Sequence, residues 1–91
     1  MGPFYVYILT NQHKTVLYTG VTRDIERRLC EHRESDASTF CGLNKSYHLI
    51  HLESFEMLID AIAREKFIKG KRRSWKEALI SKSNPEWRFL G

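Results

Sequence analysis

Two apolar runs separated by a short polar segment constrain the fold of this chain most strongly. Residues 4–10, FYVYILT, and residues 15–21, TVLYTGV, are rich in β-branched and aromatic side chains, and the polar NQHK lies between them. Such runs around a short turn predict a β-hairpin. In the first run both alternating sets of residues are apolar, which is typical of a strand covered on both faces. The first strand is therefore expected to be buried on both sides.

The pairing of the two strands decides where their tyrosines point. If the threonines that flank NQHK close the turn, Tyr7 lies directly opposite Tyr18. In the same register Tyr5 lies opposite Gly20. Opposite residues of an antiparallel pair project to one face, so this register directs both hydroxyls to one site, and a slip of one residue would separate them. Sheet packing is the alternative explanation for such a pair.

The remaining chain alternates between helical and strand patterns. Residues 23–34 and 55–70 have helical periodicity, the second ending at Gly70, while residues 46–54 alternate as a strand and residues 74–81 form a further helix. We expect an α/β domain of the α+β type, in which a small, mainly antiparallel three-stranded sheet is flanked by helices. The expected order is strand, strand, helix, strand, helix, helix. At 91 residues the chain should form a single domain, 1–91.

Composition excludes several classes of protein. No apolar stretch approaches the ~20 residues of a membrane-spanning helix, and the start of the chain lacks a signal-peptide pattern. Cys30 and Cys41 lack CxxC spacing, and the histidines lack the spacing of a zinc site, so no structural metal is expected. We therefore expect a cytoplasmic protein with reduced thiols and no membrane partner.

Positive charge is concentrated in one segment. Between residues 64 and 76 a single acid, Glu65, stands among seven basic residues. They are Arg64, Lys66, Lys69, Lys71, Arg72, Arg73 and Lys76. The run can be a solvated helix end, where cations also complement the helix dipole, or a surface that follows a phosphate backbone.

The first helix carries polar residues beside its apolar stripe. Ile25 and Leu29 define the inward face, and helical spacing puts Arg28 and His32 at its edge. A guanidinium beside the core needs an anionic partner or a carbonyl.

The long second helix breaks its own apolar pattern. Ala61 and Ile62 mark the inward face, and Glu65 falls on the same line. A carboxylate there must be paired, bound to a cation or exposed at the edge. A salt bridge to Arg64 or Lys69 is the structural explanation, and a bound metal ion is the functional one.

Together these segments resemble one known family. YVYIL…LYTGVT resembles the GIY-YIG motif, DIERRLCEH is similar to the arginine-bearing helix of that family, and AIAREKFIKG is similar to the segment with its single catalytic glutamate. The likeness covers nearly the whole chain. It points to small single-domain predicted endonucleases related to the N-terminal nuclease domain found in excinucleases. Tyr5 replaces the first glycine, and Val21 replaces a lysine common in excinuclease-type members.

The resemblance implies an endonuclease that hydrolyses phosphodiester bonds in DNA with Mg²⁺ or Mn²⁺. It implies that Glu65 is the metal ligand, that Arg28 neutralises phosphate charge, and that Tyr7 acts as the general base or positions the water. Tyr18 and His32 would orient water and phosphate. Nucleic-acid contacts are expected from Gly20, Arg64, Lys69, Lys71, Arg72, Arg73 and Asn84.

Two other functions remain open at this point. The chain could be a non-catalytic nucleic-acid-binding module on the same scaffold, since Tyr5 and Val21 depart from the motif. It could also be a small interaction protein whose aromatic tail, with Trp87 and Phe89, docks on a partner. RNA is not excluded as a substrate, and the pattern does not specify an oligomeric state.

Overall fold

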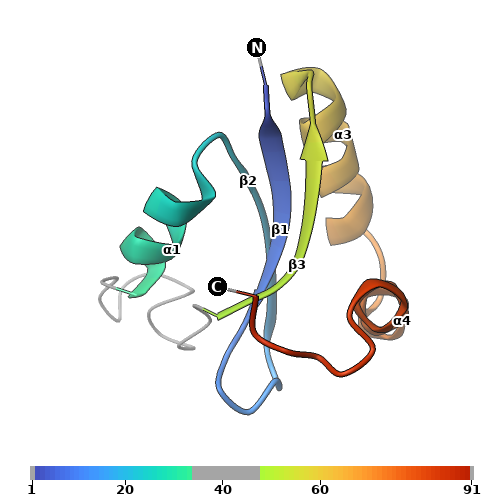
Figure 1. Ribbon diagram of the computed structural model, residues 1–91. Helices are drawn as coiled ribbons and strands as arrows, with labels where there is room; N and C mark the ends of the chain where they lie inside the picture. Colours follow the sequence, from blue (N-terminus) through green and yellow to red (C-terminus); the bar gives the residue numbers. More distant parts are fainter. Residues whose placement is uncertain (1, 34–47, 91) are drawn as a thin grey trace.

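The computed structural model describes residues 2–33 and 48–90 (Figure 1). Their elements are β1 (Phe4–Thr10), β2 (Leu17–Thr22), α1 (Ile25–Arg33), β3 (His48–Phe55), α3 (Leu58–Lys69) and α4 (Arg73–Ser83). The predicted order of strands and helices is confirmed, and so is the α+β class.

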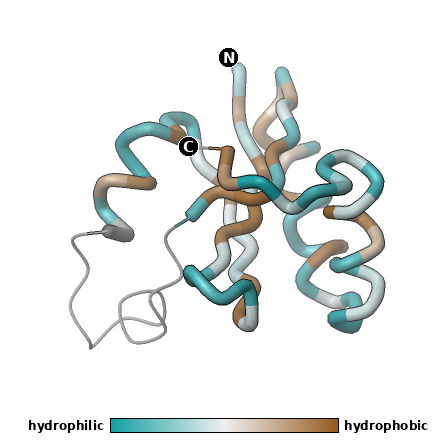
Figure 2. Tube along the Cα trace, turned by 60° about the horizontal axis from the view of Figure 1, so that its bottom comes forward, coloured by the Kyte–Doolittle hydropathy of each residue, from teal (hydrophilic) through white to brown (hydrophobic). Residues whose placement is uncertain are grey.

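The three strands form one antiparallel sheet in the order β2-β1-β3. The central strand β1 is covered on both sides, as predicted. α1 packs on one face, and α3 and α4 pack on the other (Figure 1). Apolar residues run along the strands in the middle of the molecule, whereas the helices alternate between polar and apolar positions (Figure 2). The sheet therefore separates two small cores.

Each core collects residues from one face of β1. The larger core lies under α3 and α4 and contains the buried residues Phe4, Val6, Ile8, Ile50, Ala61, Ile68 and Ile80. The smaller core lies under α1 and contains Tyr7, Leu9, Leu29 and Leu49, with Tyr18 and Ile25 packed against it. The tyrosine face of the hairpin is thus the α1 face.

The register of the hairpin differs from the predicted one by two residues. Tyr7 lies opposite Gly20, and Tyr18 lies opposite Leu9. The predicted Tyr7–Tyr18 and Tyr5–Gly20 pairs are therefore wrong. A shift of two leaves every side chain on its predicted face, because faces alternate with a period of two.

Asn11 explains the longer connection. Its Oδ1 accepts hydrogen bonds from the backbone N–H groups of Thr15 (2.8 Å) and Val16 (3.1 Å). Lys14 has a φ of 59° in the same loop, in the left-handed region. The side chain of Asn11 thus closes a loop of residues 11–16 rather than a tight NQHK turn.

The C-terminal tail packs on its own chain. Trp87 joins the larger core, and its Nε1 donates to Ser81 Oγ at 2.9 Å. The Phe89 ring stacks on His48 with centroids 4.2 Å apart, and the Leu90 N–H donates to the Leu49 carbonyl. These contacts account for both tail aromatics within the chain, so docking of the tail on a partner stays a prediction.

No helix in the described ranges is long and apolar enough to cross a bilayer.

Candidate active site

Tyr7 and Tyr18 lie together on the α1 face of the hairpin. Their ring centroids are 6.4 Å apart and the ring planes differ by 27°. Tyr7 is only 2% exposed. Its phenol lies over Gly20, where an added Cβ would be 2.5 Å from Tyr7 Cζ and closer still to its hydroxyl oxygen. The glycine therefore gives the phenol room to cross β2.

α1 packs on this pair through an apolar residue and carries basic residues beside it. The helix begins after Asp24, whose Oδ1 accepts the Arg27 N–H at 3.1 Å, and it buries Leu29 against Tyr7 and Tyr18. Arg28 follows this contact at the helix edge, and its Nη1 lies 3.5 Å from Glu31 Oε1. The position of Arg28 beside the core-facing stripe matches its prediction.

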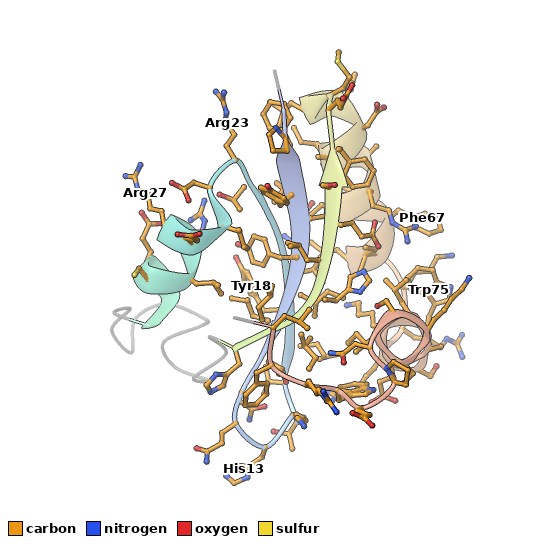
Figure 3. The ribbon with its side chains drawn as sticks, viewed as in Figure 1. His13, Tyr18, Arg23, Arg27, Phe67 and Trp75 are labelled. Atoms are coloured by element: carbon orange, nitrogen blue, oxygen red, sulfur yellow. The ribbon has the colours of Figure 1, made fainter. Side chains whose placement is uncertain are left out.

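The outer surface of α1 carries an open pocket of about 350 Å³. Its lining consists of Thr22, Arg23, Asp24, Arg27, Arg28 and Glu31. Arg23 and Arg27 point away from the sheet (Figure 3). His32 belongs to α1, but its side chain lies outside the described residues, so its predicted role stays a prediction.

Glu65 lies on α3 and is buried against the opposite face of the sheet. Its side chain is 11% exposed, and its Oε2 lies 2.7 Å from Lys69 Nζ, one helical turn away. Of the two ion-pair partners predicted for Glu65, the structure selects Lys69. Arg64 instead pairs with Glu53 on β3.

Lys69 is the link between the glutamate and the tyrosines. Its hydrogen bond to Glu65 raises the pKa of Lys69 against the lowering effect of burial. The nearby Glu65 carboxylate and the Tyr18 phenol raise this pKa further. β2, which carries Tyr18, is an edge strand, and α3 contacts it. The structure thus brings Tyr7 and Tyr18 together beneath α1, whereas Glu65 lies on α3 against the other face of the sheet. Convergence of these residues and Arg28 on one cleft is a prediction.

The carboxylate of Glu65 fits a divalent cation of the Mg²⁺ type. The residues described contain no group of three or more His, Cys, Asp and Glu side chains that could hold a metal ion. Mg²⁺ does not need such a cage, because it keeps several waters and is held by one or two carboxylates together with substrate phosphates. In the structure Glu65 Oε2 is paired with the Lys69 ammonium, so a metal ion would have to share or replace this partner.

A buried polar network on β3 was not predicted. His51 is 4% exposed, and its Nε2 lies 2.7 Å from Glu53 Oε2 while its Nδ1 lies 3.0 Å from Ser83 Oγ. Arg64 donates to both Glu53 oxygens, at 2.9 and 3.2 Å. This network ties α3 and α4 to β3.

The charge of Glu53 depends on these contacts. Burial raises the pKa of Glu53, but hydrogen bonds from Arg64 and His51 outweigh this effect and hold the pKa below its usual value. The sequence does contain a signal for this network. His51 and Glu53 are two residues apart in a predicted strand, so they share one face, and two polar residues on a covered face need partners.

The basic run divides into paired and unpaired cations. Arg73 donates to Glu77 at 2.7 Å and to the Thr15 carbonyl at 2.6 Å, and so holds the hairpin loop against α4. Within the described ranges neither Lys71 nor Arg72 forms an ion pair. Lys66 and Lys76 likewise form no ion pair in these ranges, so these four members of the run are available to meet an external anion.

Two of the predicted nucleic-acid contacts have structural explanations. Gly20 is buried beneath Tyr7. The buried Asn84 donates from Nδ2 to the carbonyls of Ile50 (3.1 Å) and Arg88 (2.8 Å), and its Oδ1 accepts the Arg88 N–H. These bonds fasten the chain after α4 to β3. Contact of Gly20 or Asn84 with nucleic acid stays a prediction.

Comparison with known proteins relates most of the chain to one family. Residues 3–78 match the model of the GIY-YIG catalytic domain. A UPF0213 protein of Syntrophus aciditrophicus is 41% identical over 87 residues, covering 94% of this chain and 98% of that protein. A UPF0213 protein of Natronomonas pharaonis is 36% identical over 77 residues, covering 85% of this chain and 89% of that protein.

A solved structure shows the same fold. The solution NMR structure of a UPF0213 protein from Bacillus halodurans superposes with a TM-score of 0.60 at 28% identity, covering 92% of this chain and 88% of that chain. The names of these relatives are family designations and state no activity.

Proposed function

The chain belongs to the GIY-YIG family, and from that premise we propose that it is a divalent-metal-dependent endonuclease that hydrolyses phosphodiester bonds in DNA. The family is a nuclease family, which implies a nucleic-acid substrate, and its nucleases generally use divalent metals. DNA as the substrate and Glu65 as the metal ligand are our finer proposals.

One observation carries the proposal. The buried carboxylate of Glu65 is met by a cation, Lys69, and both lie on α3, which packs against the strand β2 that carries Tyr18. Tyr18 in turn stacks with Tyr7. A carboxylate that accepts a cation, on a helix packed against a strand that carries one of two stacked phenols, is suited to holding a metal-bound phosphate beside hydrogen-bonding groups.

Each residue has a role that suits its surroundings. Tyr7 would act as the general base or position the attacking water. Tyr18 and His32 would orient water and phosphate, and Arg28 would neutralise phosphate charge with its forked donors. Glu65 would hold Mg²⁺ or Mn²⁺, which when bound polarises the phosphoryl oxygens and activates water.

The test is a nicking assay on supercoiled DNA with Mg²⁺, with Mn²⁺ or with a chelator, comparing wild type with Glu65→Gln. The substitution keeps the shape of the side chain but removes its charge. Loss of one transition-state contact of ~3–4 kcal/mol lowers the rate by about 10²- to 10³-fold. Because the side chain of Lys69 is 53% exposed, it regains water when the pair is broken, and the free energy of unfolding should fall by at most ~1 kcal/mol.

Glu77→Gln is the matched control. Glu77 forms an ion pair with Arg73 of the same spacing and the same 2.7 Å length, on the surface of α4. This variant should nick at the wild-type rate. Wild-type nicking by Glu65→Gln, or nicking that persists in chelator, would refute the metal-ligand assignment. Cleavage of RNA but not DNA would refute the choice of substrate.

A further inference from the structure

A cluster of two aromatic and two basic side chains lies at the junction of α3 and α4. Phe67 and Trp75 meet edge to face, with ring centroids 5.5 Å apart and planes at 81°. Lys71 Nζ lies 4.5 Å from the centroid of Phe67, and Arg64 Cζ lies 5.6 Å from it. We call these four residues the aromatic–basic cluster. Phe67 and Trp75 lie on the side of the molecule away from α1 (Figure 3).

Packing between the two helices does not account for the whole cluster. Trp75 is half-buried against the larger core and is thereby fixed, but Phe67 is 48% exposed. Arg64 is held by two hydrogen bonds to Glu53. Lys71 has no acidic partner in the part of the chain that the structure describes, and its ammonium lies over the rings of Phe67 and Trp75, where it can still meet an external anion.

Space for a ligand adjoins the cluster. An open pocket of about 450 Å³ is lined by Gly70, Lys71, Arg72, Ser74 and Trp75. Its two charged residues are both cations. An exposed aromatic ring beside two unpaired cations and an open pocket is complementary to a molecule that combines a flat π surface with phosphate.

We propose that the aromatic–basic cluster is a subsite for an unpaired nucleotide, whose base stacks on Phe67 while its phosphate is held by Lys71 and Arg72. This inference rests on the proposed nucleic-acid substrate and makes it more specific. In a duplex the faces of the bases are covered by their neighbours, so only an unpaired or unstacked base can meet the ring. Stacking on aromatic side chains together with basic residues along the backbone is how proteins bind single strands without reading sequence.

The location suggests how the subsite relates to the candidate active site. Glu65 and Phe67 are two residues apart on α3 and so project about 200° apart around the helix, which puts the cluster on the other side of the helix from the Glu65–Lys69 pair. Lys66 follows Glu65 and, like Lys69, belongs to the last turn of α3. A single strand that leaves the active site can therefore cross this basic turn to reach Phe67.

The test measures binding and needs no cleavage. Fluorescence anisotropy, with chelator present, would compare a labelled oligothymidine of about 12 nucleotides, its abasic counterpart and a duplex of the same length. The variants are Phe67→Ala, Phe67→Trp and Phe89→Ala. Phe89 is a matched control, because it is a 40% exposed phenylalanine outside the cluster.

Phe67→Ala should weaken binding of the oligothymidine by about 5- to 150-fold, the range for loss of one stacked base. Binding of the duplex and of the abasic strand should be unchanged, and so should the dependence of oligothymidine binding on salt. Phe67→Trp should restore the affinity, and Phe89→Ala should match wild type. Lys71→Gln should instead lower the salt slope by about 0.7, because one phosphate contact to a single strand is lost.

Three results would overturn the subsite. If Phe67→Ala and Phe89→Ala bind oligothymidine with equal affinity, Phe67 does not stack on a base. If Phe67→Ala weakens binding of the duplex or the abasic strand as much as that of oligothymidine, the effect is not specific to a base. If polyglutamate displaces oligothymidine from wild type but not from Phe67→Ala, the cluster binds an acidic protein partner instead. Failure of the nuclease proposal is distinguishable, since Phe67-dependent binding would then persist without nicking.

Discussion

Gly20→Ala tests the close approach of the Tyr7 phenol to Gly20 in the candidate active site. An added Cβ would lie 2.5 Å from Tyr7 Cζ and 3.1 Å from its Cε1, whereas carbon atoms in contact are normally ~3.5–4 Å apart. The phenol must therefore move by about 1 Å. Since Tyr7 is 2% exposed and packed among Leu9, Leu29 and Leu49, the phenol can move only by displacing these neighbours.

Overpacking of this kind costs about 1–3 kcal/mol. The lower entropy of alanine in the unfolded chain returns about 0.4–1 kcal/mol, so the net loss in free energy of unfolding should be about 1–2 kcal/mol. For a domain of this size that corresponds to a fall in Tm of about 5–15 °C. Urea denaturation and thermal melting followed by circular dichroism would measure both quantities.

Gly70→Ala is the matched control. Gly70 ends α3 with a φ of −76°, and an added Cβ would lie 3.6 Å from the Lys66 carbonyl oxygen and 3.7 Å from that of Phe67. Both distances are ordinary contacts, so this variant should be unchanged or stabilised by up to ~1 kcal/mol.

A double-mutant cycle identifies the clash. In a Tyr7→Leu background the phenol is gone, and the cost of Gly20→Ala should fall below ~0.5 kcal/mol. The same cost in both backgrounds would show that Tyr7 does not lie over Gly20.

Two further predictions concern charged groups. Because hydrogen bonds hold the folded pKa of Glu53 below its ordinary value, its charge stabilises the fold at neutral pH, and this contribution is lost as pH falls from about 4.5 through the folded pKa. Glu53→Gln should therefore cost about 1.5–3 kcal/mol at pH ~7 and less at pH ~3, as measured by urea denaturation, and a gap that is the same at both pH values would contradict the network. Arg72→Gln should lower the salt slope of duplex binding by about 0.9 per lost phosphate contact without changing Tm. Arg73→Gln should lower Tm because it releases the hairpin loop, and identical behaviour of the two variants would refute the division of the basic run.

Local patterns in the sequence were sufficient to predict the order of the elements and the class of the fold. Alternation in the two strands of the hairpin predicted that Tyr7 and Tyr18 share one face of the sheet. The predicted register was wrong by two residues, but the tyrosines still share a face because the faces of a strand repeat every two residues. The periodicity of residues 55–70 likewise identified Glu65 as a carboxylate on a buried stripe, which the structure confirms. The face on which a side chain lies can be predicted from the spacing of residues close in the sequence, which is why these features were predicted correctly.

Contacts between elements were decided by tertiary structure. The hydrogen bonds of Asn11 set the register, and packing of α3 chose Lys69 over Arg64 as the partner of Glu65. His51 meets Ser83 from a position 32 residues away, so no local pattern could pair them. Phe67 and Trp75 come together only because Gly70 ends one helix and α4 folds back beside it. The periods of helices and strands determine the face on which a side chain lies. Its contact partner depends on how separate elements pack, and the spacing of residues along the sequence does not contain that information.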